Sequence, residues 1–96
     1  MGFVVCGDLN RAQGGELSYL LQDCAAATEN LLLAAHGLSL GGCWLGVHPR
    51  TERVDGIRQL LDLPANIVPV AAVAVGWPAQ EAKARTRYRD DAVTER

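Results

Sequence analysis

The sequence predicts a small sheet packed on helices, in an α+β or α/β arrangement of layers. One observation is a long stretch, residues 16–36, of good helix formers without proline or glycine. A second is a shorter stretch, residues 51–64, whose apolar side chains fall on one helical face. The third is a set of short apolar runs bounded by glycine or proline, as strands usually are: residues 1–6, 43–47 and 66–78.

The composition indicates one small domain with a light core. The chain has 96 residues, of which 49% are apolar but only 5% aromatic, and much of the apolar content is alanine. A second chain is therefore expected to complete the core. The formal net charge of −2 argues against a nucleic-acid or membrane-surface role. No apolar run reaches the ~18 residues of a membrane span.

The cysteines predict a reduced, cytoplasmic protein. Cys6, Cys24 and Cys43 are odd in number, widely spaced and form no Cys-x-x-Cys pair. Such residues are typical of buried thiols that act as small apolar side chains, and we predict no metal site. The apolar run at residues 1–6 has no basic flank and is too short for a signal peptide.

The first run, MGFVVC, ends at Gly7 and Asp8 and shows no alternation of polar and apolar residues. This pattern predicts a strand buried on both faces. The helix expected at residues 16–36 is apolar around most of its circumference, so we expect it to be buried on several sides, within the domain or between subunits. Gly37 stands where a C-cap glycine usually stands.

The second half of the chain predicts a short strand, a helix and a longer strand in that order. Thr51 is the expected N-cap of the helix and Pro64 closes it. The long β-branched run that follows predicts a buried strand. Pro69 lies inside this run and lacks an N–H, which favours a sheet edge or a β-bulge at that point.

The glycine-rich stretch GGCWLGV, residues 41–47, raises the question of a bound ligand. It lacks the Gly-x-Gly-x-x-Gly spacing and follows a helix, which excludes a dinucleotide fingerprint. No Lys-Ser or Lys-Thr follows, which excludes a P-loop. The alternative interpretation is a tight turn with Trp44 in the core.

The segment from 81 to 96 is polar and basic, and we expect it to be extended or irregular. Its four alternating cations share one side of an extended chain: Lys83, Arg85, Arg87 and Arg89. Arginine suits phosphate because its planar fork donates two parallel hydrogen bonds. The alternative is a solvated tail without a ligand.

No catalytic residue is predicted. His36 lies near a helix C-terminus, His48 lies in a loop, and Asp23 and Glu29 form no obvious acid–base pair. Neither a Ser-His-Asp nor a Cys-His arrangement is suggested. If the protein is an enzyme, a cofactor has to supply the chemistry.

Several strings together resemble one known family. These are Asp23 at the start of an alanine-rich helix, ENLLLAAH, LGGCWLG, the Leu-Pro after the second helix, and VAVGWPAQEAKARTRY. From Val4 to Arg89 the chain resembles the C-terminal half of FMN-dependent nitroreductases. The resemblance implies an α+β fold in which two subunits intertwine and bind two FMN molecules at their interface. It also implies hydride transfer from NAD(P)H to FMN and reduction of a small-molecule acceptor, such as a nitroaromatic or a quinone.

The resemblance also implies which residues bind the cofactor. Trp44, Leu45 and Gly46 match the segment that contacts the flavin ring, where a backbone group approaches the nitrogen that accepts hydride. Arg85 and Arg87 match the basic pair that reaches the FMN phosphate. Ser39 stands where many relatives have glycine.

The N-terminal half of the family, with its Arg-x-Ser phosphate motif, has no counterpart here. We therefore expect residues 1–96 to form a single partial nitroreductase-like domain, with a small sheet on a long central helix and a shorter second helix. Two hypotheses follow. The chain is part of an FMN-dependent NAD(P)H oxidoreductase, or it is a non-catalytic remnant that forms a small homo-oligomer, most simply a dimer, without flavin.

Overall fold

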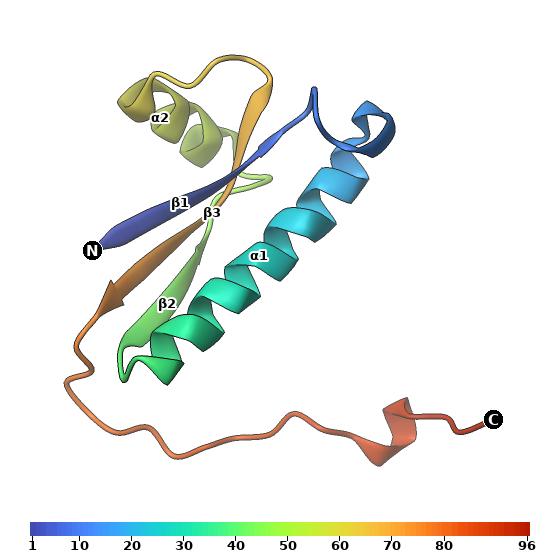
Figure 1. Ribbon diagram of the computed structural model, residues 1–96, viewed down its shortest axis with the longest axis vertical. Helices are drawn as coiled ribbons and strands as arrows, with labels where there is room; N and C mark the ends of the chain where they lie inside the picture. Colours follow the sequence, from blue (N-terminus) through green and yellow to red (C-terminus); the bar gives the residue numbers. More distant parts are fainter.

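The computed structural model describes residues 1–96 as a three-stranded sheet with two α-helices (Figure 1). Two short 3-10 helices, η1 and η2, complete the set. In chain order the elements are β1 (Gly2–Asp8), η1 (Gln13–Gly15), α1 (Leu17–Gly37), β2 (Gly41–Gly46), α2 (Thr51–Leu61), β3 (Ile67–Gly76) and η2 (Asp90–Ala92). The fold is α+β, and the predicted order of strands and helices is confirmed.

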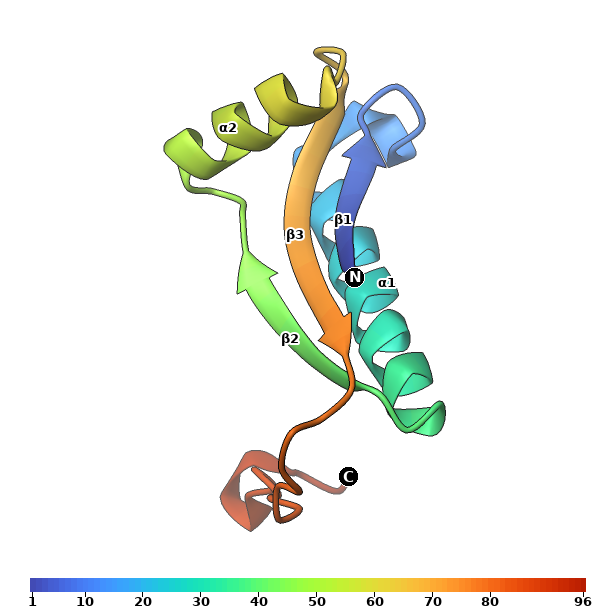
Figure 2. The same cartoon turned by 90° about the vertical axis from the view of Figure 1, so that its left-hand side faces the viewer.

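The last strand of the chain lies at the centre of the sheet. The strand order is β1-β3-β2, and β3 pairs antiparallel with both neighbours. Figure 2 shows α1 along one face of the sheet and α2 on the other side, beside the start of β3. The long buried strand predicted within residues 66–78 is β3, and its apolar character fits this central position.

A β-bulge interrupts the pairing of β1 with β3. The register shifts between Val5 and Cys6, so that Val5 pairs with Ala71 and Cys6 pairs with Pro69. Pro69 is buried and has no N–H to give to a ladder, and an irregular position is where a strand tolerates that loss. Of the two environments expected for Pro69, the bulge is correct, because β3 is not an edge strand.

The expectation that the first strand is buried on both faces is wrong. β1 is an edge strand, and its first half is exposed, with Phe3 41% and Val4 37% accessible. Only one of its edges pairs with β3, and no helix covers the side away from α1 at this end. The apolar run MGFVVC is therefore not a strand that this chain buries on both faces.

The core lies between α1 and the sheet. Leu20 and Cys24 of α1 pack against Val68 and Val70 of β3. Only four residues of α1 are buried: Leu20, Cys24, Thr28 and Ala35. Within one chain the helix is therefore buried on one side, while apolar residues such as Leu33 remain exposed on the other.

Both predicted helix caps differ from those observed. Gly37 is the last residue of α1, and Ser39 takes the left-handed conformation with φ 60°, two residues after the predicted glycine. A non-glycine residue in this region carries some strain. At α2 the N-cap is Arg50, and Thr51 is the first helical residue, with no side-chain cap hydrogen bond.

The three cysteines differ in burial, so the prediction that all are buried is wrong for Cys6 and Cys43. Cys24 is buried, Cys6 is half-buried and Cys43 is exposed on β2. Burial raises the pKa of the Cys6 thiol, and the charge of Arg58 opposes this shift. Burial also raises the pKa of Cys24, with smaller contributions from Cys6 and Asp23.

Beyond β3 the chain leaves the sheet. Residues 77–96 run away from the body of the protein in an extended path that contains only η2 (Figure 1). The extended or irregular conformation predicted for the basic segment is confirmed. None of the helices combines the length and apolar character that crossing a bilayer requires.

Candidate functional site

The glycines of β2 have two different surroundings. A Cβ at Gly42 would lie 2.7 Å from Cδ2 of Leu32, because α1 passes close to the strand there. A Cβ at Gly46 would meet no atom within 4 Å. Gly42 is therefore explained by helix packing, whereas the space beside Gly46 is open to a ligand.

Trp44 and Leu45 lie between these glycines and are both accessible. Trp44 is 41% exposed and Leu45 is 50% exposed. Successive residues of a strand point to opposite faces, so the two side chains flank the unpaired edge of β2. The alternative interpretation that placed Trp44 in the core is wrong.

The peptide after Gly46 has one bonded end and one free end. Nη1 of Arg53, on α2, donates to the Gly46 carbonyl at 2.7 Å. The next residue, Val47, is only 3% exposed, and its N–H makes no hydrogen bond within the chain. Nearly all buried backbone N–H groups in proteins have a partner, so a free one calls for an explanation.

An open pocket of about 440 Å³ lies where β2 ends and α2 begins. Its walls come from the end of β2 and from one side of α2. It is lined by Leu45, Gly46, Val47, Glu52, Arg53, Gly56 and Ile57. Two of the three ring-contacting residues predicted from the resemblance, Leu45 and Gly46, are thus at a cavity.

The predicted phosphate-binding residues are exposed and free. Arg85 and Arg87 make no hydrogen bond and no ion pair, whereas Arg89 forms a bidentate pair with Asp91. The side-chain bond to Asp91 raises the pKa of Arg89, and the same bond lowers the pKa of Asp91. Two guanidinium groups are therefore available to an anion.

The structure does not bring the two predicted groups together within one chain. The Gly46 end of β2 points toward α2, while the segment with Arg85 and Arg87 lies beyond the opposite end of the sheet in both views (Figures 1 and 2). A ligand that contacts both groups has to extend along β2 or lie between two copies of the chain.

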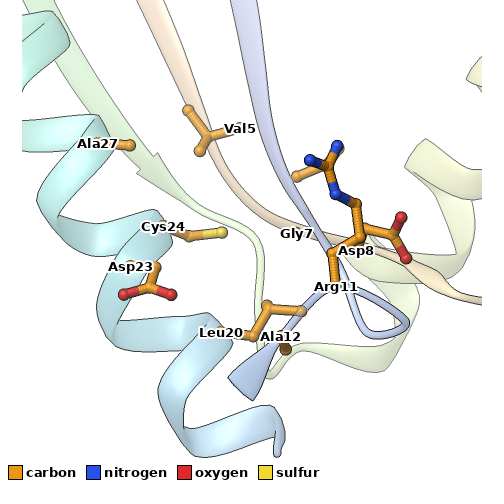
Figure 3. A pocket seen from close by; sticks show the side chains of 10 residues that line it. Val5, Gly7, Asp8, Arg11, Ala12, Leu20, Asp23, Cys24 and Ala27 are labelled. Carbon is orange, nitrogen blue, oxygen red and sulfur yellow. The ribbon is translucent and has the colours of Figure 1, made fainter. Parts of the chain in front are cut away.

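A second pocket, of about 360 Å³, contains none of the predicted residues. Figure 3 shows it between β1 and α1, with Leu20, Asp23 and Cys24 on the helix and the charged residues Asp8 and Arg11 near the end of β1. One of these, Asp8, accepts hydrogen bonds from the Asn10 N–H and from Nδ2 of Asn66. These bonds give Asp8 a structural role in the turn, so we do not take this pocket as the site.

Comparison with known proteins identifies the family. A sequence model of the nitroreductase family matches residues 3–77, which is most of the chain. The chain belongs to the nitroreductase family. A candidate NADH dehydrogenase/NAD(P)H nitroreductase of Methanothermobacter thermautotrophicus is 37% identical over 95 residues, which are 97% of this chain and 48% of that protein.

Solved structures of nitroreductases show the same fold. A candidate NADH dehydrogenase/NAD(P)H nitroreductase of Bacteroides thetaiotaomicron matches with a TM-score of 0.88 and 32% identity, over 98% of this chain and 53% of that one. An FMN-dependent nitroreductase of Clostridium difficile matches with a TM-score of 0.76 and 25% identity, over 96% and 51%. The chain thus spans about half the length of the nitroreductases that it matches.

Sequence reasoning missed Arg53 and Val47. Arg53 lies seven positions after Gly46, and a loop and the start of α2 separate the two residues. No regular sequence spacing predicts a hydrogen bond between them. The free N–H of Val47 is likewise visible only once the hydrogen bonds of its neighbours are known. One of them, His48 N–H, donates to the Val70 carbonyl at 3.0 Å.

Proposed function

We propose that this nitroreductase-family chain binds FMN and serves as the C-terminal half of an NAD(P)H-dependent oxidoreductase. The observation that carries the proposal is the peptide between Gly46 and Val47. Its N–H is unpartnered although Val47 is nearly buried, and Gly46 leaves open space beside it. A hydrogen-bond acceptor on a flat ring fits such a place, because it satisfies the donor without meeting a side chain.

The second support comes from the charged segment. Arg85 and Arg87 alternate along an extended chain and have no protein partner, so their donors are free for phosphate oxygens. Trp44 and Leu45 offer accessible apolar surface to the ring. In this assignment the arginines anchor the phosphate, and residues 44–46 position the ring.

FMN, when bound, supplies the redox chemistry by taking hydride from NAD(P)H and passing electrons to a small acceptor, such as a nitroaromatic or a quinone. The residues of this chain orient the flavin ring and exclude water from it. Gly46 leaves room for the flavin ring to approach the backbone, and the Val47 N–H donates one hydrogen bond to the ring. Trp44 covers an apolar part of the ring. No side chain of this chain is assigned to proton transfer.

We further propose that two copies of the chain associate as a homodimer. Four large apolar side chains on or directly after α1 are 40–71% exposed: Leu17, Tyr19, Leu33 and Leu38. Exposed apolar surface of this kind typically marks an interaction site. The distance between the Gly46 end of β2 and the basic segment also supports a site to which two copies contribute (Figure 2).

The test is a titration of the purified chain with FMN, followed by flavin fluorescence and visible absorbance. Saturable binding with a shifted absorbance band supports the proposal and leads directly to an assay of NAD(P)H oxidation. An absence of binding at high micromolar FMN contradicts it. In that case the non-catalytic homo-oligomer without flavin describes the chain better.

A further inference from the structure

Arg53 is the one side chain that hydrogen-bonds to the peptide between Gly46 and Val47, beside which we place the flavin ring. It lies in the first turn of α2, and Nη1 donates to the Gly46 carbonyl at 2.7 Å. We infer that Arg53 is a positioning residue that fixes this peptide and places a positive charge beside the ring. The inference rests on the function proposed above, and its test below separates the two.

The first step of the argument is geometric. A peptide unit is planar and trans, so the carbonyl of Gly46 and the N–H of Val47 point in opposite directions from one rigid plane. When Arg53 holds the carbonyl, it also fixes the direction of the free N–H. Glycine allows more backbone conformations than other residues, so Arg53 adds to the hold that the pairing of Gly46 with Ala71 gives this plane.

The second step concerns charge. A guanidinium remains protonated at any relevant pH, and Arg53 takes part in no ion pair, since the only one in the chain joins Arg89 and Asp91. Its charge is therefore not neutralised by a contacting carboxylate. Reduced flavin carries more negative charge than oxidised flavin, so a nearby fixed cation favours the reduced form.

The same helix offers a matched control. Arg58, one and a half turns further along α2, also donates to backbone carbonyls, those of Pro64 at 2.9 Å and Ala65 at 3.2 Å. Its carbonyl partners lie in the loop before β3, not at Gly46. Replacing Arg58 removes the same chemistry from α2 without touching the proposed ring segment.

The first measurement needs no flavin. We expect Arg53→Ala to lower the ¹⁵N order parameter of the Val47 N–H from about 0.85, a rigid value, toward 0.6, a flexible one. Arg58→Ala should leave it unchanged. An unchanged order parameter in Arg53→Ala overturns the positioning role, whether or not the chain binds FMN.

The second measurement is the midpoint potential of bound flavin. Arg53→Ala should reduce the preference for reduced over oxidised FMN about tenfold, which is about 30 mV toward more negative potential for a two-electron couple. Arg53→Lys, which keeps the charge, should restore most of this shift, and Arg58→Ala should show none. If the unchanged chain and Arg53→Ala have equal midpoint potentials, the charge of Arg53 does not favour reduced flavin, and that claim is overturned. If the unchanged chain binds no FMN, the proposed function fails and the flavin part of this inference fails with it, while the order parameter still decides the contact.

Discussion

Gly7 and Leu20 are in direct contact across the junction of β1 and α1. A Cβ at Gly7 would lie 2.3 Å from Cγ of Leu20, closer than any real Cβ contact allows. Leu20 is also a member of the buried cluster between α1 and β3. The absence of a side chain at position 7 therefore sets how closely the helix approaches the sheet.

We predict that Gly7→Ala destabilises the fold by roughly 1–3 kcal/mol, because the branched end of Leu20 has to leave its position in the core. Gly2→Ala on the same strand is the control, since a Cβ there meets nothing within 4 Å. Thermal or urea unfolding followed by circular dichroism measures both. Equal stability of the two variants would show that Leu20 moves at no cost.

A paired substitution on β2 separates packing from binding. Gly42→Ala should lower the free energy of unfolding, since its Cβ would lie 2.7 Å from a methyl group of Leu32. Gly46→Ala should leave stability nearly unchanged but weaken FMN binding at least tenfold, or about 1.4 kcal/mol. Unfolding and FMN titration of both variants check this. Full FMN affinity in Gly46→Ala contradicts the ring assignment.

The double variant Arg85→Ala with Arg87→Ala should weaken FMN binding roughly ten- to hundredfold without changing stability. Charge-assisted hydrogen bonds contribute ~1.5–3 kcal/mol each, and exposure to solvent reduces that value. Arg89→Ala is the matched control, because its guanidinium is already paired with Asp91. Isothermal titration with FMN measures the affinity of both variants. Equal losses of FMN affinity would indicate a nonspecific effect of charge.

Leu33→Asp should convert the proposed dimer into a monomer. Leu33 lies on the outer side of α1 and is 60% exposed, so a carboxylate there costs the single chain little but is unfavourable inside an interface. Equilibrium sedimentation of both proteins provides the test. A chain that is already monomeric before substitution refutes the dimer.

Alkaline pH should destabilise the protein through its half-buried and buried thiols. Burial raises the pKa of Cys6 and Cys24 above the ordinary value of 9.0. Above that value the unfolded chain loses these protons while the folded chain retains them, so the free energy of unfolding falls as pH rises. Unfolding curves between about pH 8 and pH 10 should show a shallower decline in Cys24→Ala than in the unchanged chain.

Local sequence signals predicted the elements well. Residues 16–36 were expected as a helix and α1 spans Leu17–Gly37, because good helix formers and the lack of proline act over short range. Pro69 predicted an edge or a bulge because its missing N–H is a property of the residue itself, and the structure has the bulge. The three strands and both α-helices could all be placed before the structure was known.

Burial was predicted less well, since it depends on which chain segments meet. Val4 and Trp44 are as apolar as core residues, yet both lie on edge strands of a sheet that this chain does not cover completely. The exposure of Cys43 has the same origin. The apolar character of a residue does not show which segments cover it, and that depends on the packing of the whole chain.

The candidate site was predicted in part. Leu45 and Gly46 border an open pocket with an unsatisfied backbone donor next to it, whereas Trp44 does not line that pocket. What the sequence could not provide is the relation of this segment to Arg53, which depends on how the loop at 47–50 returns α2 to the end of β2.

The strand order β1-β3-β2 has a consequence for biosynthesis. Neither β1 nor β2 has any strand to pair with until residues 67–76 have left the ribosome, because both pair only with β3. Until then α1 lacks its sheet, and the apolar side chains that face the sheet stay exposed. The sheet therefore assembles only after β3, the last of its three strands, has been synthesised.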